Sequence, residues 1–73
     1  MECEIIVNGT TLLVRLDGEI DHHTAKGTRE KIDNEIENTS PNSLVLDFSD
    51  VSFMDSSGIG LIMGRYKAMK AIG

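Results

Sequence analysis

Ser43-Leu44-Val45-Leu46-Asp47-Phe48 is a nearly continuous apolar run, and it decides the fold class because helical periodicity occurs on both sides of it. Such a run is typical of a strand that helices cover on both faces of an α/β sheet. We therefore expect residues 43–48 to form the central strand of an α/β domain.

The segment before this strand predicts a helix over about residues 22–37. Its apolar stripe recurs at steps of three or four residues: Ala25, Thr28, Ile32 and Ile36. Asp21 stands directly before the helix, where a carboxylate is a good N-cap because it accepts hydrogen bonds from free backbone N–H groups. Residues 38–42 have the composition of a loop.

Nearer the N-terminus the sequence predicts a β-hairpin. Residues 3–8 and 11–17 have strand patterns, and Asn8-Gly9 between them is a tight-turn dipeptide. Apolar residues alternate along the second strand, so one of its faces should be buried. Residues 18–20 are expected to leave the sheet.

Beyond the apolar run, residues 49–54 should form a short connection, and Asp55-Ser56-Ser57-Gly58 should open a second helix with Asp55 as its cap. The apolar face expected for this helix consists of Ile59, Ile62, Met63, Tyr66 and Met69. The element order is then ββαβα, a mixed β-sheet packed with α-helices.

With 73 residues, the chain is predicted to be one domain, residues 1–73. Three strands and two amphipathic helices leave apolar surface uncovered. We therefore expect the domain to be truncated at its C-terminus, with the missing portion supplied by a longer chain or by a partner. An exposed sheet edge would also allow two copies to pair as a homodimer.

Charge and composition exclude several classes of partner. The net charge is −5, and six of the seven basic residues are spread along the two predicted helices, so no nucleic acid is expected. Neither a membrane-spanning run nor a signal peptide is present in the sequence, which predicts a cytoplasmic protein without a membrane partner. The lone Cys3 cannot form an internal disulfide.

The Ser56-Ser57 pair is the first candidate for chemistry. A serine at a helix start is most often an ordinary cap or first-turn residue. The same position also suits a phosphoserine, because free N–H groups and the helix dipole stabilise a phosphate there. From the residues alone both readings stay open.

Enzymatic and metal-binding alternatives have weaker support. Catalysis by a serine needs an oriented base, and Gly-x-Ser-x-Gly is absent. The glycines from Gly58 to Gly64 lie within a helix at the wrong spacing for a dinucleotide loop. Asp21, His22 and His23 are adjacent, and adjacent helical positions do not face one another. No catalytic residue, cofactor or metal site is therefore predicted.

Two segments together point to a family: Leu16-Asp17-Gly18-Glu19-Ile20-Asp21-His22-His23-Thr24-Ala25 and Val51-Ser52-Phe53-Met54-Asp55-Ser56-Ser57-Gly58-Ile59-Gly60. With Gly64-Arg65-Tyr66-Lys67, they resemble STAS domains, and among these the anti-sigma factor antagonists of the sporulation sigma-F pathway. The resemblance covers the whole chain in the same order. It implies a STAS-like fold of which this chain is the N-terminal two-thirds.

The resemblance implies a regulatory protein that is not an enzyme. The unphosphorylated form would bind an anti-sigma factor serine kinase with bound nucleotide and so release the sigma factor. That kinase would phosphorylate Ser56, and a phosphatase would restore the serine. The partner-binding residues implied are Glu19, Asp21, His22, Ser57, Gly58 and Ile59.

A phosphate carries about −1.5 to −2 charges, here beside Asp55. We therefore predict a local switch in which repulsion and bulk abolish binding without refolding. The alternatives are a STAS module of another pathway, such as a stress-response antagonist or a transporter domain, and a small nucleotide-binding module.

Overall fold

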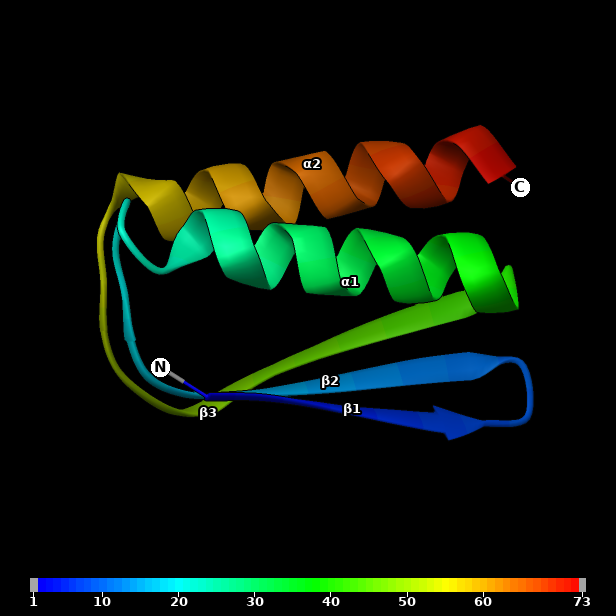
Figure 1. The fold of residues 1–73 in the computed structure, drawn as a ribbon, viewed down its shortest axis with the longest axis horizontal. Helices are drawn as coiled ribbons and strands as arrows, with labels where there is room; N and C mark the ends of the chain where they lie inside the picture. Colours follow the sequence, from blue (N-terminus) through cyan, green and yellow to red (C-terminus); the bar gives the residue numbers. More distant parts are fainter. Residues whose placement is uncertain (1, 73) are drawn as a thin grey trace.

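The computed structural model describes residues 2–72 and confirms the predicted ββαβα order. The elements are β1 (Glu2–Asn8), β2 (Thr11–Ile20), α1 (Ala25–Thr39), β3 (Ser43–Met54) and α2 (Ser56–Ile72). Both helices lie on one face of a mixed three-stranded sheet (Figure 1). The opposite face carries no helix within residues 2–72.

The predicted hairpin is confirmed. Strands β1 and β2 are antiparallel, with Asn8 paired to Thr11 across the turn. Gly9 has a φ of 62°, in the left-handed region that glycine adopts without steric cost and that tight hairpin turns require.

The prediction that residues 43–48 form the central strand is wrong. The strand order is β1-β2-β3, so β2 is central and β3 has a strand neighbour on one side within the described chain. Leu44 and Leu46 face the helices and are half-buried, whereas Val45 faces the other way and is 46% exposed. An apolar run alone does not show whether both faces of a strand are covered.

Both parallel strands also extend further than predicted. Residues 18–20 stay in the sheet, and residues 49–54 continue β3 instead of forming a connection. Glu19 pairs with Phe53 and Ile20 with Met54, beyond two register shifts in the ladder. Gly18, with a φ of 100°, lies at one of these register shifts. The irregular pairing lets β2 and β3 stay paired beyond the residues whose pattern predicted strands.

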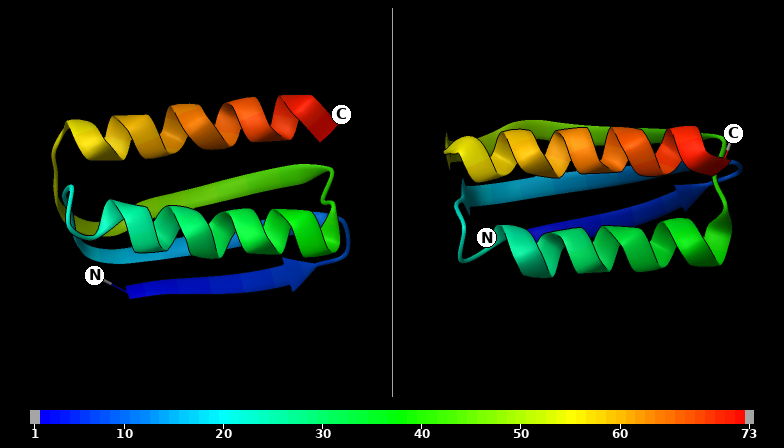
Figure 2. Two further views of the ribbon diagram at one scale, coloured as in Figure 1. Left: turned by 45° about the horizontal axis from the view of Figure 1, so that its top comes forward. Right: turned by 90° about the horizontal axis from the view of Figure 1, so that it is seen from above.

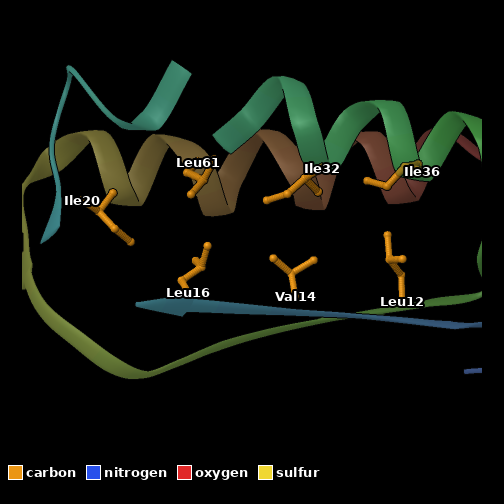
Figure 3. Packing of buried hydrophobic residues seen from close by; sticks show 7 residues of the cluster. All are labelled: Leu12, Val14, Leu16, Ile20, Ile32, Ile36 and Leu61. Atoms are coloured by element: carbon orange, nitrogen blue, oxygen red, sulfur yellow. The ribbon is translucent and has the colours of Figure 1, made fainter. Parts of the chain in front are cut away.

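Helix α1 begins three residues later than predicted and buries three of the four residues of the predicted stripe, with Ala25 half-buried. Thr28, Ile32 and Ile36 are buried. The helix ends at Thr39, two residues into the predicted loop, and the N–H of the C-cap residue Ser40 donates to the carbonyl of Ile36 at 2.8 Å. The core is built mainly from β2, whose buried side chains Leu12, Val14 and Leu16 point towards the helices (Figure 3). Its buried apolar residues are Leu12, Val14, Leu16, Ile20, Ile32, Ile36 and Leu61.

The prediction of which residues of α2 are buried is wrong in part. Ile59, Met63 and Tyr66 are 53–60% exposed, while Leu61 and Arg65 are buried. Apolar residues occur around most of this helix, so its pattern defines no single face. The exposed side chains confirm that apolar surface is left uncovered. Within residues 2–72 neither helix is long and apolar enough to cross a membrane.

Candidate functional site

The connections that lead into the two helices lie side by side at one end of the molecule (Figure 2). Because β2 and β3 are parallel, their C-terminal ends meet at the same edge of the sheet. The Asp55 N–H donates a hydrogen bond of 3.1 Å to the carbonyl of Ile20. The two segments that carry the family resemblance are thereby held together.

The start of α2 presents a serine hydroxyl on a capped helix end. The N–H of Ser57 donates to Oδ1 of Asp55 at 2.8 Å, which confirms the predicted capping role of Asp55. Ser56 is exposed, whereas Ser57 is half-buried. Of the two hydroxyl-bearing residues, Ser56 is therefore the more accessible to solvent.

Gly58 is buried and allows α2 to approach β2 and β3 closely. A Cβ at this position would collide with the Met54 side chain and lie 3.5 Å from Cγ2 of Ile20. The glycine therefore fixes how the serine-bearing turn sits against the sheet. Its buried position supports packing rather than direct contact with a partner.

Asp21 organises the turn before α1 and is not the cap of that helix. Its Oδ1 accepts hydrogen bonds from the N–H groups of His23 at 2.9 Å and Thr24 at 3.1 Å. The N-cap position falls on Thr24 instead, because residues 21–24 form a turn of their own. The hydrogen bond from the Thr24 N–H is the main reason why the pKa of Asp21 lies below its ordinary value.

The histidines also differ from expectation, because both precede the helix. Their ring centroids are 4.0 Å apart, so the two rings lie against each other. Within residues 2–72 no group of three or more His, Cys, Asp or Glu side chains could hold a metal ion.

The structure gathers most of the predicted site residues at this end of the molecule. Glu19, His22 and Ile59 are exposed, and Asp21 and Ser57 are half-buried. His22 and Ser57 line one hollow between the two helices. Gly58 alone of the six is buried.

Sequence reasoning missed two members of this site. Lys26 and Arg29 of α1 line the same hollow as Ser57, although their pattern suggested only a solvated helix face. Their spacing of three residues places them on one side of the helix, which is the signal that could have singled them out.

Comparison with known proteins assigns the fold to a family. Residues 2–73 match the model of the STAS domain, so the chain belongs to the STAS domain family. It is 45% identical over 62 residues to an anti-sigma F factor antagonist of Paenibacillus polymyxa, covering 85% of this chain and 53% of that protein. It is 36% identical over 66 residues to the anti-sigma-B factor antagonist of Bacillus subtilis (strain 168), covering 90% and 59%.

Two solved structures of the anti-sigma factor antagonist SpoIIAA have the same fold. The unphosphorylated form aligns with a TM-score of 0.81, at 36% identity, over 97% of this chain and 66% of that one. The phosphorylated form, from Bacillus, aligns with a TM-score of 0.79, at 36% identity, over 97% and 65%. The chain thus spans little more than half the length of the curated relatives given above.

Proposed function

We propose that this STAS domain acts as an anti-sigma factor antagonist whose binding is controlled by phosphorylation of Ser56. The observation that carries the proposal is the exposed Ser56 on an Asp55-capped helix start, beside the turn of Asp21 and His22. The names of the relatives support the same function.

In this function the protein is a substrate and a binding module, not an enzyme. An anti-sigma factor kinase transfers the γ-phosphoryl group of its bound ATP to Oγ of Ser56, which loses its proton, and ADP remains. A phosphatase later hydrolyses the phosphate ester and restores the serine. The unphosphorylated form binds the kinase and thereby releases the sigma factor.

The surface for the anti-sigma factor surrounds Ser56. Glu19, Asp21, His22, Ser57 and Ile59 contact the partner, while Gly58 holds α2 against the sheet. A phosphate adds about −1.5 to −2 charges next to Asp55 and bulk at the centre of this surface. Repulsion and steric exclusion then abolish binding.

The switch needs little movement of the backbone. The positive end of the α2 dipole accommodates the phosphate without a change of fold. The TM-scores of 0.81 and 0.79 with the unphosphorylated and phosphorylated forms of SpoIIAA support this view.

The test is intact mass measurement with site mapping after incubation with Mg-ATP and the anti-sigma F factor of Paenibacillus polymyxa. One phosphoryl group on Ser56 is expected. Ser56→Ala should remain unmodified yet still bind, and Ser57→Ala should be modified as the wild type is. An unmodified wild-type chain, in a reaction that phosphorylates the Paenibacillus antagonist, would refute the proposal.

A stress-response antagonist is the second candidate, because the chain is also 36% identical to the anti-sigma-B factor antagonist. The two pathways use the same switch and differ in partner. Titration with the anti-sigma F and anti-sigma-B factors side by side separates them, and tighter binding to the anti-sigma F factor is expected.

A further inference from the structure

We propose that the groove between the first halves of α1 and α2 receives an acidic segment of the anti-sigma factor, and that Lys26 and Arg29 select this segment by charge. The inference rests on the proposed function and adds the chemistry of the partner. The groove has a volume of about 310 Å³.

The groove has an apolar floor and a cationic rim. Ala25 and Leu61 supply apolar contact from the two helices, and Ser57 supplies a hydroxyl at one end. Lys26 and Arg29 are both exposed and come from α1. The groove therefore suits a side chain with a short apolar stem and a carboxylate head.

The two cations form no ion pair within residues 2–72. The ion pairs within residues 2–72 join Arg15 to Glu4 and Asp47, and Arg65 to Asp33. Neither Lys26 nor Arg29 takes part in any of them. In a chain of net charge −5, a cationic groove next to the serine pair is a local exception, and an external carboxylate complements it.

The neighbouring surface carries the opposite charge. Asp21 and Asp55 lie in the two connections that meet at this end of the molecule, while the cations lie on α1. Such a separation of charge fixes the orientation of a partner and excludes partners of the wrong pattern. A phosphate on Ser56 would oppose this segment, because it repels carboxylates and attracts the same cations.

The test compares affinities of charge variants for the anti-sigma F factor of Paenibacillus polymyxa with ADP bound. Lys26→Glu/Arg29→Glu is expected to bind about tenfold more weakly, with a shallower salt dependence, because two favourable charges are reversed. Lys67→Glu/Lys70→Glu, the same change in net charge at the far end of α2, should bind within about twofold of the wild type. Lys26→Arg/Arg29→Lys should bind as the wild type does.

The neutral variant Lys26→Gln/Arg29→Gln removes the two charges without introducing new repulsion. Its affinity for the anti-sigma F factor should lie between that of the wild type and that of Lys26→Glu/Arg29→Glu. Equal affinities of both Glu double variants would overturn the inference. If Ser56→Asp still loses binding in that experiment, the proposed function stands and the groove proposal alone fails. If Ser56→Asp and Ser56→Ala bind equally well, the proposed switch itself fails.

Discussion

Nε of Arg65 on α2 lies 2.8 Å from Oδ1 of Asp33 on α1. The arginine side chain is 7% exposed and that of Asp33 is 43% exposed. Burial lowers the pKa of Arg65, and the charge of Asp33 opposes this shift. Neither these two atoms nor Nη1 of Arg65 has an aligned hydrogen bond within residues 2–72. The helices are thus joined by a charge contact that offsets desolvation incompletely.

Removing the Asp33 carboxylate alone should therefore lower the free energy of unfolding more than removing the charges of both Asp33 and Arg65. Asp33→Ala leaves a buried cation without its partner, and we expect it to lower the free energy of unfolding by about 1–3 kcal/mol. Asp33→Ala/Arg65→Met replaces the pair by an apolar contact and should lose less. Urea denaturation of the two variants gives the comparison. A larger loss in the double variant would show that the ion pair is a net source of stability.

The close approach at Gly58 predicts that alanine is tolerated less well there than elsewhere in α2. Gly58→Ala should have a free energy of unfolding about 1–3 kcal/mol below that of Gly64→Ala, because its Cβ forces the Met54 side chain to move. Gly64→Ala is the matched control, since a Cβ there meets nothing within 4 Å. The control should gain up to about 1 kcal/mol from helix propensity.

Met54→Ala tests the cause of this loss. In the Met54→Ala background, Gly58→Ala should cost much less than in the wild type, because the colliding side chain is absent. Thermal denaturation of the four members of this cycle gives the coupling. Additive losses would place the cost of Gly58→Ala in the backbone instead.

Acid should destabilise the turn before α1. The pKa of Asp21 is lowered in the folded state by hydrogen bonds, first from the Thr24 N–H. A carboxyl with a lowered folded pKa contributes stability above its unfolded pKa and loses that contribution as the pH falls through the folded value. The Tm of the wild type should therefore fall below about pH 4. Asp21→Asn should show a smaller fall between pH 5 and pH 3 in the same buffers, and parallel curves would contradict this role.

Local sequence patterns predicted the individual helices and strands better than they predicted which elements pack against one another. The Asn8-Gly9 turn and the stripe of Thr28, Ile32 and Ile36 depend on residues close in sequence, and both are confirmed. The pairing of β3 with β2 alone, within residues 2–72, and the burial of Arg65 depend on contacts between distant elements. An apolar run or a helical pattern in the sequence does not predict those contacts.

The residues of the candidate site also differ in how far the local sequence predicts them. Asp55 was recognised as a cap from its position before a helix, and the hydrogen bond to the Ser57 N–H confirms it. Lys26 and Arg29 have ordinary positions on a helix surface, so their place beside Ser57 emerges only when α1 and α2 pack together. Electrostatic features built from two elements require the tertiary structure.

Phosphorylation of Ser56 should change stability in a way that depends on Asp55. The phosphate gains from the N-terminal end of the α2 dipole but is repelled by the adjacent carboxylate, so the two effects oppose each other in the wild type. Asp55→Asn keeps an oxygen that can accept the Ser57 N–H and removes the charge. Phosphorylation should therefore raise the Tm more in Asp55→Asn than in the wild type, by the equivalent of about 0.3–1 kcal/mol. Calorimetry of both proteins, before and after quantitative phosphorylation, measures the difference. The same Tm change in both would mean that Asp55 does not act on the phosphate by charge.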